Sequence, residues 1–222
     1  MRTLCERSLE YANDIFICFV DFEKAFDRVD WAKLLQILKG LGGDWRDRRL
    51  IANLYLNQKS VVKVMREFSE DSDIGRGVRQ GCCISPMLFN IYAEAMMTEA
   101  MEGIEEGNKV GGKLIQDVRF ADDQGMIAST ENGLQKIMDK LNATAENFGM
   151  KINTKKTKVM KVSRNVGEEI NIMINGSRIE QVKSFKYLGS TMTEDGRCET
   201  DIKVRIALAK EAFSKRGELL TR

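Results

Sequence analysis

Two adjacent aspartates, Asp122 and Asp123, lie between stretches in which apolar and polar residues alternate as they do in β-strands. The alternation runs through residues 115–120 and resumes at residues 126–128, which predicts a β-hairpin with the pair at its tip. Neighbouring carboxylates repel each other, so keeping both ionised there costs free energy unless a cation neutralises them. A plain polar turn is the alternative, because aspartate is common in turns.

A third carboxylate, Asp21, closes another apolar segment, residues 15–22, which predicts a buried strand. One carboxylate from a strand and two from a hairpin form an oxygen-rich set that suits two divalent cations. Two-metal sites activate an attacking oxygen and stabilise a leaving oxygen in phosphoryl transfer. Asp27 and Asp30, which follow closely, are interpreted as structural caps rather than ligands.

The sequence contains no histidine, and this absence narrows the chemistry. It excludes a Ser-His-Asp triad, a histidine base and a Cys/His zinc site. The five cysteines have no paired spacing and are expected to be reduced thiols of an intracellular protein, nuclear or cytoplasmic. The longest apolar run is Ile15–Val20 and there is no signal peptide, so no association with a membrane is expected.

Charge is nearly balanced over the 222 residues, with 35 Lys and Arg against 33 Asp and Glu, so net charge does not indicate a nucleic-acid-binding protein. Its distribution is uneven, because residues 151–164 include six basic residues and no acid. Such a run is either a solvated face or a track for a nucleic-acid backbone, and the sequence does not decide between them. The length allows one core, or a core and a smaller lobe.

The order of expected helices and strands is mixed, which favours an α+β fold over a regular βαβ repeat. One helix is expected to begin with Ser85 as its N-cap and Pro86 as its first residue, and to be central because it is apolar on nearly all sides. Asp30 is expected to cap a second helix, and Ser129 or Thr130 a third. The other expected helices span residues 4–11, 45–56 and 200–220, and the other expected strands span residues 60–64, 170–174, 178–182 and 185–188.

Five segments, in order, resemble the sequence motifs of reverse transcriptases. Residues 19–27 (FVDFEKAFD) resemble motif A, residues 79–90 (RQGCCISPMLFN) motif B, residues 120–123 (FADD) motif C and residues 149–158 (GMKINTKKTK) motif D. Residues 185–189 (FKYLG) resemble the segment that the family uses near the primer grip. The ordered set covers about residues 15–190, and it is most similar to non-LTR, LINE-type retrotransposon enzymes, in which Phe or Tyr precedes Ala-Asp-Asp.

The resemblance implies an α+β polymerase palm, in which an antiparallel sheet packs on helices in the ferredoxin or RRM manner, with partial fingers and the start of a thumb. Residues 1–192 would form the palm with partial fingers, and residues 193–222 a helix leading toward the thumb. The implied activity is that of an RNA-directed DNA polymerase, a two-metal transfer from dNTP to a primer 3′-hydroxyl with two Mg²⁺ ions, or Mn²⁺ in their place. Implied partners are dNTPs, an RNA or DNA template with its primer, and further domains of a longer polyprotein.

The resemblance also assigns roles to single residues. Asp21 and Asp122 would be the principal metal ligands and catalytic residues, and Asp123 would assist them. Lys156 would place a catalytic cation near the leaving pyrophosphate, with the adjacent Lys155 as the alternative. Phe26 matches the aromatic steric gate of the family, which packs under the sugar and favours deoxynucleotides. The alternative is that Phe26 is an ordinary core residue. Further substrate contacts are implied for Phe22, Arg79, Gln80 and Gly81.

Two other interpretations stay open. The first is a transposon-derived remnant that is catalytically inactive and at most binds nucleic acid. Only about 14 residues precede the motif A strand, where the family has an extended fingers region with basic residues for the triphosphate, so activity of the chain by itself is an open question. The second is another palm-type nucleotidyltransferase, such as a cyclase, which fits the carboxylates but not residues 79–81 followed by Ser85 and Pro86.

Overall fold

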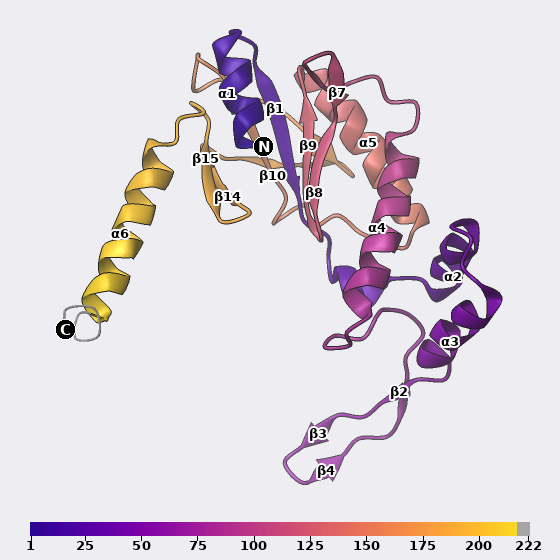
Figure 1. The fold of residues 1–222 in the computed structure, drawn as a ribbon. Helices are drawn as coiled ribbons and strands as arrows, with labels where there is room; N and C mark the ends of the chain where they lie inside the picture. Colours follow the sequence, from indigo (N-terminus) through magenta and orange to yellow (C-terminus); the bar gives the residue numbers. More distant parts are fainter. Residues whose placement is uncertain (217–222) are drawn as a thin grey trace.

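A five-stranded β-sheet forms the centre of the protein in the computed structural model, which describes residues 1–216 (Figure 1). The strands lie in the order β13-β10-β1-β9-β8. Their bounds are Ile15–Val20 for β1, Asp117–Phe120 for β8, Asp123–Ala128 for β9, Lys158–Val162 for β10 and Glu180–Gln181 for β13. The middle strand, β1, pairs antiparallel with both β9 and β10, whereas β13 joins β10 in parallel. The chain therefore folds into an α+β domain, as the sequence predicts.

Both faces of the sheet are covered, which explains why β1 is apolar without a break. Phe16, Cys18 and Val20 belong to the core on the side of helices α4 (Ser85–Met101) and α5 (Glu131–Asn147). The alternate residues of β1 face the other side, where α1 (Arg2–Glu10) and the β14–β15 hairpin lie (Figure 1). Because successive side chains point to opposite faces, one strand supplies two separate cores.

The remaining elements surround this layered core. α2 (Trp31–Gly40) and α3 (Trp45–Tyr55) follow a short 3-10 turn at Ala25–Arg28, and α2 packs against α4. α6 (Glu199–Lys215) extends away from the sheet on the side opposite α4 (Figure 1). The short strands are β2 (Lys59–Ser60), β3 (Lys63–Val64), β4 (Glu67–Phe68), β5 (Ser72–Asp73), β6 (Asn108–Val110), β7 (Lys113–Ile115), β11 (Met173–Ile174), β12 (Ser177–Arg178), β14 (Ser184–Tyr187) and β15 (Ser190–Thr193).

Two of the predicted caps, those at Asp30 and Thr130, are present. The carboxylate of Asp30 accepts a hydrogen bond from the Lys33 amide at 2.8 Å, and the hydroxyl of Thr130 accepts one from the Gly133 amide at 3.0 Å. The prediction for Ser85 is wrong, because the chain already turns at residues 82–84 and Ile84 is the N-cap of α4. Ser85 lies buried inside the helix, and Pro86 comes second rather than first.

Several expected strands differ from those in the structure. The strand expected at residues 60–64 is divided between two ladders, β2–β5 and β3–β4, which form an exposed projection beyond α3 (Figure 1). The strands expected at residues 170–174 and 178–182 are each shorter or broken. The last four residues of the helix expected at 200–220 lie outside the described residues.

Helix α4 is central on one face only. Phe89, Tyr92 and Met96 are buried on the side that meets the sheet and α5. On the outer side Met87 is 59% exposed. Among residues 1–216, the structure contains no helix that is long and apolar enough to cross a membrane.

Candidate active site

The register of the sheet brings the three predicted carboxylates to one end of it. Val20 lies opposite Gln124, so Asp21, which follows β1, comes beside Asp123, which begins β9. The predicted hairpin is present: Phe120 pairs with Asp123, and Ala121 and Asp122 form a two-residue turn between β8 and β9. Ala121 has a φ of 53°, a left-handed conformation that costs a non-glycine residue free energy and that is often found at functional sites.

In the part of the chain that the structure describes, the three carboxylates at this end of the sheet lack positively charged or hydrogen-bonding partners that would stabilise them. One carboxylate oxygen of Asp21, Oδ1, is buried and has no hydrogen-bond partner among the described residues. Burial and then the negative charges of Asp122 and Asp21 raise the pKa of Asp123. A cation would satisfy the buried oxygen and relieve this repulsion, so the donor set fits a hard divalent metal.

The carboxylates are not yet arranged as a closed metal site. Within residues 1–216, no three acidic or thiol side chains are gathered closely enough to hold a metal ion as they stand. The side chains of Asp122 and Asp123 are exposed at the hairpin tip, and that of Asp21 is half-buried. Metal binding would therefore have to draw the three carboxylates closer together.

The backbone around Asp21 is fixed by the segment that resembles motif D. The Asp21 amide donates to the hydroxyl of the fully buried Thr157 at 3.2 Å, and the Asp21 carbonyl accepts from the Asn153 amide at 2.8 Å. The side chain of Asn153 in turn accepts from the amides of Lys155 and Lys156, at 3.2 and 3.3 Å. Both lysines are exposed on this turn, and its geometry does not choose between them.

Most charges of the basic run at residues 151–164 have partners within the fold. Lys161 is buried and pairs with Asp14 at 2.9 Å and with Glu168. The others with partners are Lys151 with Glu23, Lys158 with Glu180, and Arg164 with the carbonyls of Leu9 and Glu10. Lys155 and Lys156 form no ion pair within the part of the chain that the structure describes. Most charges of this run therefore stabilise the fold, a role that differs from both a solvated face and a track for a nucleic-acid backbone.

The two phenylalanines of motif A have different surroundings. Phe22 is buried in the core on the helical side, so a substrate contact there would have to come from its backbone. Phe26 is partly exposed and its ring stacks on that of Phe89, with ring centroids 4.6 Å apart and planes 15° apart. A supported aromatic ring with one open side is compatible with both a steric gate and a core residue.

The loop that resembles motif B is tied to motif A. The amide of Val78 donates to the carbonyl of Phe26 at 2.8 Å, and the side chain of Gln80 donates to that of Asp27 at 3.5 Å. Asp27 is therefore not the cap that the sequence predicts, since it faces this loop. Gly77 has a φ of +96°, and a Cβ there would lie 2.9 Å from the Asp27 Cα, so only glycine fits.

The three predicted substrate contacts of motif B lie on the surface beside motif A. Arg79, Gln80 and Gly81 are exposed. The Arg79 guanidinium lies 3.4 Å from the side-chain oxygen of Gln58, and a Cβ on Gly81 would meet open space. The structure thus brings motifs A, B, C and D to the same end of the domain.

Sequence reasoning missed the support behind the hairpin. The hydroxyl of the buried Tyr187, in β14, donates to the Val118 carbonyl at 2.8 Å and lies 3.2 Å from the Asp123 carbonyl. Burial and the nearby charges of Asp123 and Asp117 raise the pKa of Tyr187 to about 12. The resemblance of residues 185–189 to a family segment was the available signal, but it did not indicate this contact.

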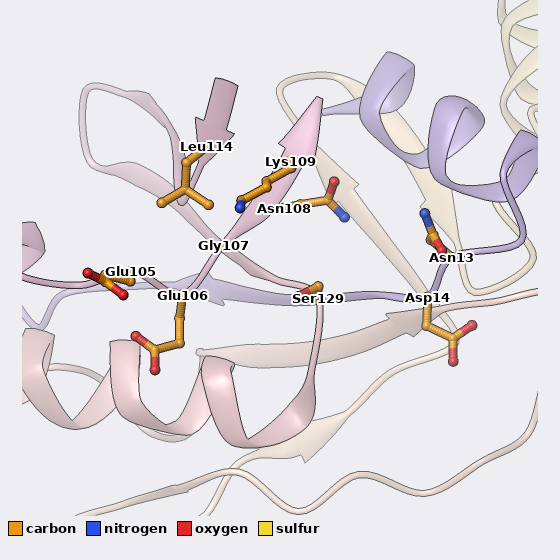
Figure 2. Close-up of a pocket in the computed structure, with 9 residues that line it drawn as sticks. All are labelled: Asn13, Asp14, Glu105, Glu106, Gly107, Asn108, Lys109, Leu114 and Ser129. Carbon is orange, nitrogen blue, oxygen red and sulfur yellow. The ribbon is translucent and has the colours of Figure 1, made fainter. Parts of the chain in front are cut away.

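A separate cavity of about 510 Å³ opens at the other end of β1 (Figure 2). It lies about 20 Å from Asp21, since six strand residues separate them. Two of its acids already have partners, because Asp14 pairs with Lys161 at 2.9 Å and Glu106 pairs with Lys136 at 2.6 Å. The cavity contains no motif residue and is not part of the candidate active site.

Comparison with known proteins identifies the family. A family model described as "Reverse transcriptase (RNA-dependent DNA polymerase)" matches residues 2–192. The chain belongs to the reverse transcriptase family. The prediction of a reverse transcriptase domain of the non-LTR retrotransposon type is confirmed by relatives that carry names of retrotransposable or mobile elements.

Two relatives illustrate the similarity of this reverse transcriptase domain. The domain is 27% identical over 199 residues to the Retrovirus-related Pol polyprotein from type-2 retrotransposable element R2DM of Drosophila melanogaster, covering 86% of this chain and 19% of the relative. It is 27% identical over 176 residues to the RNA-directed DNA polymerase from mobile element jockey of the same species, covering 78% of this chain and 19% of the relative. The chain thus spans about a fifth of the length of these relatives.

Solved structures show the fold of the reverse transcriptase domain. Telomerase from Candida tropicalis, in complex with a TWJ fragment of telomeric RNA, has a TM-score of 0.60 at 15% identity, covering 81% of this chain and 30% of that chain. The apo form of telomerase from the same organism has a TM-score of 0.59 at 14% identity, covering 87% and 33%. The polymerase palm-like character of the fold is therefore confirmed.

Proposed function

We propose that this reverse transcriptase domain catalyses RNA-directed DNA synthesis, in which the primer 3′-hydroxyl attacks the α-phosphate of a dNTP and pyrophosphate leaves. The observation that carries the proposal is the buried Oδ1 of Asp21, which has no hydrogen-bond partner among residues 1–216. The nearby Asp123 carboxyl, whose pKa is raised, belongs to the same acidic cluster. Asp21, Asp122 and Asp123 would hold two Mg²⁺ ions, for which Mn²⁺ can substitute. When bound, such ions lower the pKa of the attacking hydroxyl and neutralise charge on the leaving group.

The other motif residues would bind and orient the nucleotide. Lys156, or Lys155 beside it, would place a positive charge near the leaving pyrophosphate. This is supported by Asn153, whose side chain accepts from both lysine amides and whose own amide donates to the Asp21 carbonyl. The supported ring of Phe26 would pack under the sugar and exclude a 2′-hydroxyl. Arg79, Gln80 and Gly81 would contact the nucleotide or template strand, since they lie exposed in front of α4.

The chain order and sheet order support a finer description of the fold. The elements β1, α4, β8, β9, α5 and β10 follow one another as βαββαβ, and the four strands lie in the order β10-β1-β9-β8. This order favours a ferredoxin-like palm. In the same proposal, residues 1–192 are the palm with partial fingers, and residues 193–222 lead toward a thumb.

The proposed partners follow from the relatives. An RNA or DNA template with its primer and dNTPs would be the substrates. Further domains of a longer polyprotein are supported by the length of the relatives, of which this chain spans about a fifth. Such domains would supply additional contacts to the triphosphate.

Primer extension on an RNA template with Mg²⁺ tests the proposal. The wild-type chain should incorporate dNTPs, and Asp122→Asn, which removes one ligand charge while keeping the shape, should abolish incorporation. Asp139→Asn, on the exposed side of α5, is the matched control and should keep full activity. A wild-type chain that incorporates no more than Asp122→Asn contradicts the proposal.

One observation favours a second candidate function, a domain that binds nucleic acid without catalysis. The three carboxylates are not gathered into a metal site among residues 1–216. In that case filter binding would detect a complex with a primer–template, Asp122→Asn would leave its affinity unchanged, and no incorporation would be found with Mg²⁺ or Mn²⁺.

A further inference from the structure

An apolar groove runs along the outer face of α4. The α4 groove, a cavity of about 1050 Å³, lies between α4 and the end of α2. Its apolar lining is exposed: Leu41 is 69% and Met87 is 59% accessible. A helix that is apolar on nearly all sides is normally buried, and an uncovered apolar surface marks a docking site. The apolar residues of the α4 groove are Ile37, Leu41, Pro86, Met87, Ile91 and Ala95.

The rim of the α4 groove is acidic. Glu94, Glu99 and Glu102 line it along α4. Glu94 pairs with Arg119 at 2.7 Å, whereas Glu99 and Glu102 form no ion pair with any residue that the structure describes. This charge repels phosphate groups and attracts basic side chains. A suitable occupant is therefore a helix with an apolar stripe and basic flanks.

Helix α6 of this chain has both properties. Ile202, Ile206 and Phe213 lie on one side of the helix, and each is about half exposed. Lys203 and Lys210 lie along one edge of this stripe, and the exposed Val204 and Leu208 lie on the opposite side of the helix. With 17 residues, α6 is about 25 Å long, which matches the length of α4 that the groove follows.

The helix cannot reach the groove of its own chain. The Asp201 carboxylate accepts hydrogen bonds from the Thr191 amide at 2.8 Å and from Arg205 at 2.8 Å, so the first turn of α6 is fixed to β15. From there α6 extends on the side of the sheet opposite α4 (Figure 1). We propose that α6 docks in the α4 groove of a second copy, and that two chains exchange these helices in a two-fold symmetric dimer.

The size of the interface sets the expected strength. A helix about 25 Å long and about 10 Å wide covers roughly 250 Å² of each partner. Two reciprocal contacts bury roughly 1,000 Å² in total, which is at the lower limit for a specific interface. Self-association should accordingly be in the micromolar range.

Sedimentation equilibrium of the full chain, with two charge-reversed variants, tests the proposal. Lys203→Glu with Lys210→Glu makes the helix acidic, and Glu99→Lys with Glu102→Lys makes the groove basic. Each variant alone should self-associate about tenfold more weakly, because attraction becomes repulsion at both contacts. An equimolar mixture should recover the dimer, since each helix then meets a groove of opposite charge. Lys109→Glu with Lys113→Glu, on the exposed β6–β7 hairpin, is the matched control.

Three outcomes would overturn the proposal: a wild-type chain that stays monomeric well above micromolar concentration, a dimer that neither variant weakens, or a mixture no more dimeric than its components. If the helix variant instead loses affinity for a nucleic-acid duplex, α6 serves the nucleic acid and the proposal fails. Circular dichroism checks that both variants fold. Asp122→Asn should dimerise as the wild type does, which separates this result from the test of catalysis.

Discussion

The hydroxyl of Tyr187 offers a sharp test of how the hairpin is supported. It is buried and donates at 2.8 Å to the carbonyl of Val118, in the strand before the aspartate pair. Tyr187→Phe removes this donor and keeps the ring, whose centroid lies 5.4 Å from that of Phe19. The substitution therefore isolates one hydrogen bond from the packing around it.

The expected loss follows from the burial of the Tyr187 hydroxyl, whose partner carbonyl belongs to the partly buried Val118. A neutral hydrogen bond contributes about 1 kcal/mol, and a partly buried carbonyl left without its partner brings the loss to roughly 1–2 kcal/mol. In a domain of this length, that loss lowers Tm by roughly 2–8 °C. Tyr187→Ala also leaves a cavity, and its loss should be roughly 3–5 kcal/mol.

Calorimetry and urea unfolding measure these losses, and Tyr11→Phe, at a largely exposed ring, is the control. The free energy of unfolding should fall in the order Tyr11→Phe, Tyr187→Phe, Tyr187→Ala. A Tyr187→Phe chain as stable as Tyr11→Phe would refute the reasoning, because it would show that the hydroxyl contributes nothing to the hairpin.

Three further predictions concern other parts of the fold. Gly77→Ala forces a Cβ to 2.9 Å from the Asp27 backbone and should cost roughly 2–4 kcal/mol in urea unfolding. Burial raises the pKa of Tyr92 and Tyr187 to about 12. The stability that these hydroxyls contribute is therefore complete below pH 10 and is lost as the pH rises through 12. Unfolding at alkaline pH should show this loss in the wild type and a smaller one in Tyr92→Phe and Tyr187→Phe. The Thr191 amide lowers the pKa of Asp201, so the Asp201 carboxylate should continue to anchor α6 in acid and should release it only below the ordinary carboxyl range. Hydrogen exchange of the α6 amides measures this release. The Asp201→Asn substitution should loosen the helix already at neutral pH.

Local sequence determined the elements whose partners are local. The caps at Asp30 and Thr130 were predictable because the bond spans three residues. Strand β1 was predictable because burial on both faces requires an unbroken apolar run. Strand β10 was missed because it contains Lys158 and Lys161, whose charges are neutralised by residues distant in sequence.

The residues of the candidate site likewise fall into those that local sequence predicts and those that it does not. Its carboxylates were found from acids placed where apolar strands end, and the family motifs gave their order. The groups that hold them, the Thr157 hydroxyl and the Tyr187 hydroxyl, act on backbone atoms 136 and 64 residues away. No local sequence pattern predicts such contacts, because threonine and tyrosine also occur at many positions where their hydroxyls contact no distant backbone atom.

The central position of β1 has a consequence for biosynthesis. Both neighbours of this strand, β9 and β10, are synthesised more than 100 residues after it. At ribosomal speeds of about 5–20 residues per second, its six apolar residues wait roughly 5–20 s before either neighbour exists. During that interval Ile15–Val20 is a short, uncharged segment of high β-propensity, the kind that pairs with other chains. The strand that organises the finished domain is thus also a segment through which unfinished chains can associate with one another.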